Sequence, residues 1–152
     1  MSLMRILKPF CLMLAVSLIA AAPLAAGEKK LMHCFAFTTV EGASDADWQA
    51  FYNATDQLPS KVPGISKVWY GKLRAPLNQF TTTGEARKKL AAGEKSVSAE
   101  VSRTVRQSGV CMEMADEAGL KAYAAHPYHK EWEAAYSKVR VAGTTTYDIL
   151  GQ

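Results

Sequence analysis

The chain has 152 residues, 49% of them hydrophobic, which is long enough for one domain with a substantial core. The formal net charge is +4, and Arg5 and Lys8 contribute two of these charges, which leaves +2 on the rest of the chain. A chain this close to neutrality gives no electrostatic reason to expect nucleic acid as a partner. We interpret the basic run 87–89 as a solvated helix face. The sequence contains neither a glycine-rich phosphate loop nor a Cys-x-x-Cys pair.

Residues 1–26 have the pattern of a secretory signal peptide. Two basic residues precede an apolar run, Cys11 to Ala22, and small residues follow it. We expect cleavage after Ala26, so that the mature protein, residues 27–152, is periplasmic or secreted and has no membrane partner. An uncleaved membrane anchor is the alternative, although the apolar run is short for a membrane span.

The mature chain is predicted to form two similar halves, each with a strand, a helix and a strand. In the first half, alternation over 31–38 predicts a strand that has His33 and two phenylalanines on one face. Ser44 and Asp47 are spaced as a capping box at the start of a helix, and a Pro-Gly pair then leads into a second strand at 65–73. The buried stripe of this helix is predicted to be Trp48, Phe51, Tyr52, Thr55 and Leu58.

The second half follows a segment without a clear pattern. We interpret residues 75–100 as an exposed insertion that contains a short polar helix at about 85–92. A third strand is predicted at about 102–115. Two helices then meet at Pro127, and the β-branched run 144–150 closes the domain as a fourth strand.

This order of elements is the split βαβ plan, a ferredoxin-like α+β domain with a four-stranded antiparallel sheet and helices on one face. The other face is also apolar, because strand alternation places Met32, Cys34 and Ala36 there, together with Cys111. An open apolar sheet face on a small exported domain needs a cover. The simplest cover is a second copy related by a two-fold axis, so we expect a homodimer.

The segment Tyr123–His129 holds the phenol of Tyr123 and two imidazoles around Pro127. Asp116 can cap the helix that leads into it, and the proline both ends that helix and suits the first turn of the next one. The spacing of the second helix turns His129 inward. The residues that share its face are Trp132, Tyr136 and Val139. An inward imidazole beside a phenol is either a buried structural pair or a functional site.

The chain resembles the Dabb family, the dimeric α/β-barrel group that is also called the stress-responsive A/B barrel proteins. The matching pieces are Met32–Phe37, Val62–Ile65 followed by Tyr70–Lys72, and Met114–Leu120 leading into the Tyr-x-x-His-Pro-x-His motif at 123–129. Together they cover most of residues 31–139, and the histidine motif is the most specific of them. The resemblance implies a ferredoxin-like fold and a homodimer whose sheets face each other.

Some plant members of this family act as polyketide cyclases and resemble this chain at the same motif. The resemblance implies that Tyr123 and His129 would make the proton transfers and that His33 would line the pocket. The chain departs from the cyclase pattern at Ser108, where the cyclase has a further pocket histidine. It also departs in being exported, away from cytosolic thioester substrates. The fold alone does not give a reaction.

Acid/base chemistry is also consistent with the residue types themselves. The imidazole of His129 could remove a proton next to a carbonyl, and the phenol of Tyr123 could donate a hydrogen bond to the developing oxygen. The residues expected to contact a ligand are His33, Phe35, Phe37, Phe51, Tyr52, Met112, Met114, His126 and Trp132.

Each of these residues also has a purely structural interpretation. His126 could simply cap a helix, and His129 and Tyr123 could be core residues with satisfied hydrogen bonds. A metal site built from the three histidines is not expected, because no carboxylate or cysteine has ligand spacing. No cofactor is expected either.

Three functions remain open from the sequence. The first is an exported homodimer that binds a small, largely apolar molecule between helices and sheet. The second is an acid/base enzyme, of the cyclase or lyase type, and the third is a structural stress-response dimer without ligand. A free cavity bordered by His33, Tyr123 and His129 would favour the first two.

Removal of the signal peptide leaves two cysteines, Cys34 and Cys111. Both are predicted on the helix-free face of neighbouring antiparallel strands. They could form a cross-strand disulfide if their Cα atoms come within about 5.5–6 Å. The alternative, which we prefer from the sequence, is a pair of small buried thiols that a second subunit protects.

Overall fold

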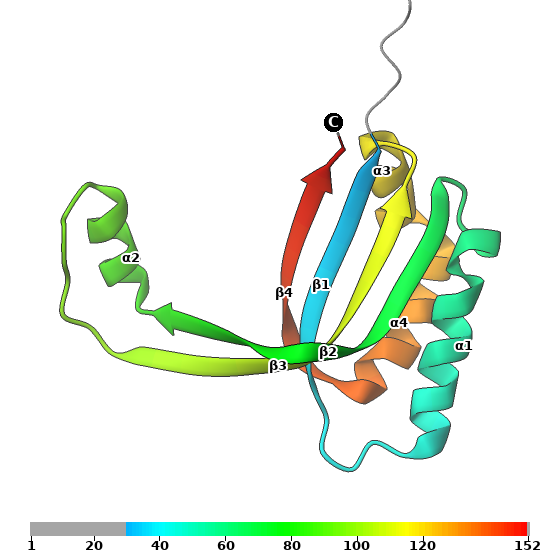
Figure 1. Ribbon diagram of the computed structural model, residues 1–152, viewed down its shortest axis with the longest axis horizontal. Helices are drawn as coiled ribbons and strands as arrows, with labels where there is room; N and C mark the ends of the chain where they lie inside the picture. The colour runs from blue at the N-terminus through cyan, green and yellow to red at the C-terminus, as the bar shows by residue number, and fades with distance from the viewer. Residues whose placement is uncertain (1–29, 152) are drawn as a thin grey trace, which may run out of the picture.

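The computed structural model describes residues 30–151, so the predicted signal peptide lies outside the described part of the chain. The elements are β1 (Leu31–Thr39), α1 (Asp45–Lys61), β2 (Ile65–Thr82), α2 (Gly84–Ala91), β3 (Val101–Met114), α3 (Glu117–Ala125), α4 (Pro127–Val139) and β4 (Arg140–Leu150). The strands form one antiparallel sheet in the order β2-β3-β1-β4. Helices α1, α3 and α4 cover one face of the sheet (Figure 1). This confirms the predicted ferredoxin-like α+β fold.

The helix boundaries follow from the capping residues identified in the sequence. The Ser44 side chain accepts a hydrogen bond from the Asp47 backbone N–H, which completes a capping box for α1. The Asp116 side chain accepts one from the Gly119 N–H at 2.6 Å and starts α3. Pro127 occupies the first turn of α4, as its fixed φ favours.

The core lies between the helices and one face of β1 and β3. Phe37, Val110 and Met112 point into it from the sheet and are at most 1% exposed. From α4, the rings of Trp132 and Tyr136 pack against each other and against the phenylalanines of β1. The indole N–H of Trp132 donates to the Thr55 hydroxyl of α1 at 3.0 Å, which ties the two long helices together through a buried hydrogen bond.

The predicted insertion at 75–100 belongs to an arm that is built from the extended end of β2, α2 and the first half of β3. Strand β2 does not end at about 73 but continues to Thr82, paired with the first half of β3, and α2 lies at the tip. The pairing register shifts between Lys72 and Leu77, where Pro76 cannot donate to the ladder. The strands bend there, and the arm passes the ends of β1 and β4 and projects beyond them (Figure 1).

Arg106 fixes the base of this arm. Its guanidinium donates hydrogen bonds to the Thr38 hydroxyl of β1, the Gly143 carbonyl and Thr145 hydroxyl of β4, and the Gln79 side chain of β2. The residue is 7% exposed, and no carboxylate of residues 30–151 pairs with it. One buried cation therefore joins the arm to both strands that it crosses.

The helix-free face carries a disulfide. Cys34 and Cys111 lie directly opposite each other on β1 and β3, with Cα atoms 4.1 Å apart, and their sulfurs are bonded. The preference for two free thiols was therefore wrong, because the strand register brings the side chains together on one face. Trp69 on β2 and Tyr147 on β4 continue the same row across the sheet. None of the helices in residues 30–151 is long and apolar enough to cross a membrane.

Candidate functional site

The break at Pro127 brings Tyr123 and His129 together. Tyr123 lies in the last turn of α3 and His129 in the first turn of α4, and their ring centroids are 4.5 Å apart. Trp132, one turn further along α4, stacks on the imidazole at 6.1 Å. The ring nitrogens of His129 have no hydrogen-bond partner within residues 30–151. Both residues predicted to transfer protons therefore lie side by side, and the imidazole nitrogens are available for a further hydrogen bond.

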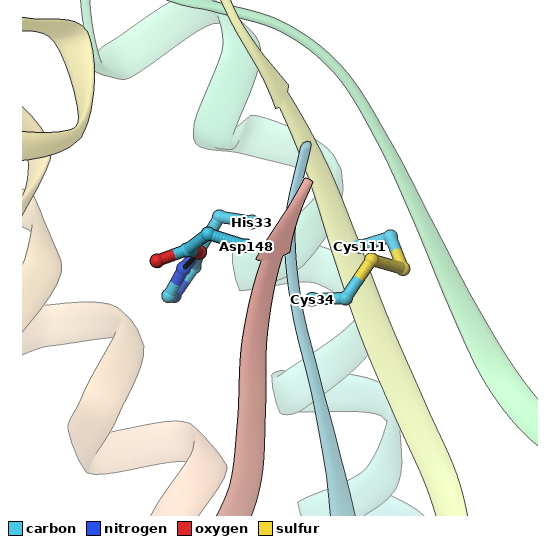
Figure 2. Close-up of a disulfide and its surroundings, with 4 residues drawn as sticks. All are labelled: His33, Cys34, Cys111 and Asp148. Carbon is cyan, nitrogen blue, oxygen red and sulfur yellow. Dashed lines mark hydrogen bonds and ion pairs between the residues drawn. A yellow bond between two sulfur atoms is a disulfide. The ribbon is translucent and has the colours of Figure 1, made fainter. Parts of the chain in front are cut away.

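The second imidazole comes from the sheet. His33 on β1 and Asp148 on β4 are paired in the antiparallel register, and His33 Nδ1 lies 2.6 Å from Asp148 Oδ1. Figure 2 shows this pair on the side of β1 opposite to the disulfide, toward the helices. A carboxylate on Nδ1 orients the ring and leaves Nε2 for other contacts. The His33 ring lies 6.2 Å from the Tyr123 ring, so the phenol is near both imidazoles.

These side chains border one cavity, which we call the histidine pocket. Its volume is about 260 Å³, slightly below the range of about 300–1,000 Å³ that is common for ligand sites. It is lined by His33, Phe35, Leu120, Tyr123, Ala124, His129, Trp132, Glu133, Tyr136, Arg140, Thr144 and Thr146. A pocket of this size suits a small molecule, and most of its wall is aromatic or aliphatic.

Burial determines the ionisation of the two phenols in this pocket. Tyr123 is 3% exposed, and burial is the main cause of a pKa raised well above that of a free tyrosine, with a smaller contribution from Glu133. Burial also raises the pKa of Tyr136, although Arg140 partly offsets this. Both phenols are therefore neutral near pH 7. They can donate a hydrogen bond to an oxygen that becomes negative.

Seven of the residues that line the pocket were not predicted as functional: Leu120, Ala124, Glu133, Tyr136, Arg140, Thr144 and Thr146. Asp148 was not predicted either, and it supports His33 from outside the lining. The Arg140 guanidinium forms an ion pair with Glu133 and lies over the Tyr136 ring, with Cζ 4.5 Å from the ring centroid. Arg140 directly follows α4 and begins β4, so its position depends on where the helix ends. A sequence pattern could have identified Asp148 only if the register of β4 on β1 had been known.

The other residues predicted to bind a ligand do not all line the histidine pocket. Phe35 and Trp132 line the histidine pocket, whereas Phe37, Phe51 and Tyr52 line a second cavity of about 880 Å³. This cavity lies between α1 and the bend of β2, and we call it the bend cleft. Neither His33, Tyr123 nor His129 reaches it, so the larger cavity is not where the candidate proton-transfer groups are.

Met112, Met114 and His126 lie outside both cavities, and Met114 is fully buried. Met112 is fully buried in the core. His126 caps α4, because its Nδ1 accepts a hydrogen bond from the Tyr128 backbone N–H at 3.2 Å. Ligand contact by any of the predicted residues stays a prediction. Residues 30–151 contain no group of three or more His, Cys, Asp or Glu side chains that could hold a metal ion.

Comparison with known proteins shows likeness at the level of the fold. No protein-family model matches the chain, and no curated protein matches its sequence. A Dabb family protein with a ferredoxin-like fold from Mesorhizobium loti superposes with a TM-score of 0.53 at 13% identity, over 82% of this chain and 99% of that chain. This is the fold that the Dabb resemblance implies.

Two further solved structures are similar to the chain. A dimeric ferredoxin-like protein of unknown function from Thermobifida fusca gives a TM-score of 0.53 at 17% identity, over 81% of this chain and 92% of that chain. The hydroxynitrile lyase of Passiflora edulis gives 0.55 at 9% identity, over 83% of this chain and 95% of that chain. At these identities the likeness shows the fold, and the function must be argued from the site.

Proposed function

We propose that the protein binds a small, largely apolar molecule in the histidine pocket and that it works as an exported homodimer. The observation that carries this proposal is a free cavity bordered by His33, Tyr123 and His129. In a structural dimer without ligand, the side chains of the chain itself would fill this space. Aromatic and aliphatic side chains form most of the wall, so the body of the ligand is apolar.

The dimer is supported by the surface of the helix-free face. Trp69, Tyr147 and Ile149 are 44%, 50% and 55% exposed there, beside the disulfide. Large apolar side chains grouped on one face are typical of an interface. The similar protein from Thermobifida fusca is a dimer, and a two-fold pairing of sheets would cover this face.

Export is supported by the bond between Cys34 and Cys111. Disulfides persist in the periplasm and outside the cell but are rare in the reducing cytosol. The bond therefore agrees with the signal-peptide pattern of residues 1–26.

The test is a search for a small molecule that copurifies with the protein. Native mass spectrometry of wild-type protein should show a bound mass that denaturation releases. His129→Ala should lose this mass while the protein remains folded, and Gln57→Glu, an exposed change on α1, should keep it. If the wild type carries no such mass and binds no member of a library of small aromatic and aliphatic compounds, the proposal is wrong.

Acid/base catalysis is the second candidate, and the pairing of His33 with Asp148 favours it. A neutral imidazole that donates its Nδ1–H to a carboxylate has Nε2 available as a base. His33 would then take the role of base that the sequence predicts for His129. It could remove a proton next to a carbonyl while the neutral Tyr123 phenol donates to the developing oxygen. Asp148 would then position the base without touching the ligand. The solved structures similar to this chain include a lyase, which agrees with this candidate at the level of the fold.

A further inference from the structure

Two buried polar atoms within residues 30–151 have no hydrogen-bond partner, and both belong to residues that line the histidine pocket. They are the hydroxyl oxygen of Tyr136 and Nε of Arg140. Native structures satisfy most buried polar groups, so each exception requires an explanation. Two such atoms, on two residues that line the same small cavity, suggest a shared cause, namely a ligand that supplies the missing acceptor.

Neighbouring side chains hold these two atoms in place but form no hydrogen bond with them. Tyr136 is 2% exposed, and its ring packs against Trp132 on the same helix. The Arg140 guanidinium lies over the Tyr136 ring, with Cζ 4.5 Å from the ring centroid, and its Nη2 is paired with Glu133. Nε is therefore a buried donor without a partner, on a guanidinium that is fixed by two contacts.

The chemistry of the two atoms restricts what can bind to them. Arg140 Nε is a cationic N–H donor and cannot accept, and Tyr136 keeps its proton because burial raises its pKa. The matching group on a ligand is an acceptor with more than one lone pair, and a negative charge strengthens both bonds. The positive charge of Arg140 is already partly balanced by the carboxylate of Glu133. The site therefore suits a ligand group with one negative charge better than a group with two.

We propose that Tyr136 and Arg140 form a subsite for a carboxylate, so that the ligand of the histidine pocket is a small carboxylic acid with an apolar body. This inference rests on the proposed function and specifies its ligand class. The carboxylate accepts hydrogen bonds from the Tyr136 hydroxyl and from Arg140 Nε. The apolar body lies against Phe35 and Trp132, in the remainder of a cavity of about 260 Å³.

The test compares two probes of the same ring size, benzoate and benzyl alcohol, by calorimetric or NMR titration of the purified protein. Benzoate should bind at least about tenfold more tightly than benzyl alcohol, because only benzoate offers a charged acceptor. Tyr136→Phe should weaken benzoate binding about tenfold and leave benzyl alcohol unchanged. Arg140→Lys keeps the positive charge but removes Nε, and should also weaken benzoate selectively.

Tyr128→Phe is the matched control on the same helix. The Tyr128 hydroxyl donates to the Ala54 carbonyl at 3.1 Å and does not line the pocket. This variant should lower the melting temperature and leave benzoate affinity unchanged. Tyr136→Phe should instead keep or raise the melting temperature of the free protein, because it removes a buried hydroxyl that bonds to nothing within residues 30–151. A merely structural role for Tyr136 would not separate affinity from stability in this way.

The outcomes distinguish this inference from the proposed function. If benzoate and benzyl alcohol bind equally well, the carboxylate subsite is wrong while ligand binding in the pocket stands. If Tyr136→Phe and Arg140→Lys bind benzoate as the wild type does, the subsite is wrong as well. If neither probe binds, the carboxylate subsite is contradicted, whereas the proposed binding of a small apolar molecule is decided by the copurifying mass and the compound library.

Discussion

His33 and His129 differ in what surrounds their ring nitrogens. His33 is tied to Asp148 through Nδ1 and is oriented by the sheet. His129 is held only by packing between Tyr123 and Trp132, and its ring nitrogens have no partner within residues 30–151. His129 is half-buried, and its ring nitrogens are not among the buried side-chain atoms that lack a partner. They are therefore accessible, and the imidazole can contact a ligand in the histidine pocket that it lines.

Removal of the His129 ring tests this directly. His129→Ala should reduce affinity for the copurifying ligand, or for benzoate, at least about tenfold, while costing roughly 1–2 kcal/mol of stability because only packing is lost. Affinity and unfolding in urea should be measured on the same samples. A variant that unfolds or aggregates would support the structural interpretation of His129. Tyr123→Phe is the milder companion, since it removes only a hydroxyl and keeps the ring.

The buried phenol of Tyr123 also predicts a pH effect. Its pKa is raised in the folded state by burial, whereas an unfolded tyrosine ionises near pH 10. Above that pH the unfolded chain releases a proton that the folded chain keeps, so stability falls as the pH rises. Melting temperatures from about pH 8 to about pH 11 should fall less for Tyr123→Phe than for the wild type. Parallel curves for the two proteins would contradict this.

The candidate site was only partly predictable at the residue scale. Tyr123, His129 and His33 could be identified because a short motif and strand alternation are local properties of the sequence. Asp148 could not, because its contact depends on how β4 is aligned with β1. A slip of one residue would turn its side chain to the other face of the sheet. The role of Arg140 depends in the same way on tertiary structure.

At the scale of elements, the arm differs most from expectation. The sequence predicts an exposed insertion at 75–100, because the run 81–84, three threonines and a glycine, is typical of a loop. Pairing with β3 overrides that local signal, since the partner strand supplies the hydrogen bonds on both sides of the bend. Strand β4 likewise starts at Arg140 rather than at Thr144, directly after α4, because it pairs with the end of β1 at Thr39.

Arg106 should control how firmly the arm is held. Arg106→Met removes the donors for Thr38, Thr145, Gln79 and the Gly143 carbonyl, and should destabilise the protein by about 1–3 kcal/mol. Trypsin should then cleave the arm faster in the native protein, at the basic residues of α2. Arg103→Met is the matched control, because it also removes one tryptic site but breaks a single exposed hydrogen bond, to Asn78. Equal cleavage rates for both variants would show that Arg106 does not hold the arm.

At the scale of the whole molecule, the two faces of the sheet have different roles. The helix-covered face supplies His33 and Phe35 to the histidine pocket, whereas the opposite face carries the disulfide and exposed apolar side chains. Because neighbouring residues of a strand point to opposite faces, His33 and Cys34 serve these two faces from adjacent positions. Binding and assembly can therefore be disturbed separately, which makes the proposed dimer testable without loss of the pocket.

Tyr147→Glu should separate the dimer into monomers. The side chain is 50% exposed in the single chain and lies next to the disulfide in the row across the helix-free face. In a two-fold dimer of facing sheets it would be buried, and an unpaired carboxylate in such an interface is strongly unfavourable. Gln57→Glu introduces the same charge on the exposed side of α1, on the opposite layer, and should leave the dimer intact. Light scattering at micromolar concentration measures the mass of both variants, and binding of benzoate reports on the pocket. If Tyr147→Glu remains a dimer as tight as the wild type, or if the wild type itself is a monomer, the protein does not assemble as a two-fold dimer of facing sheets.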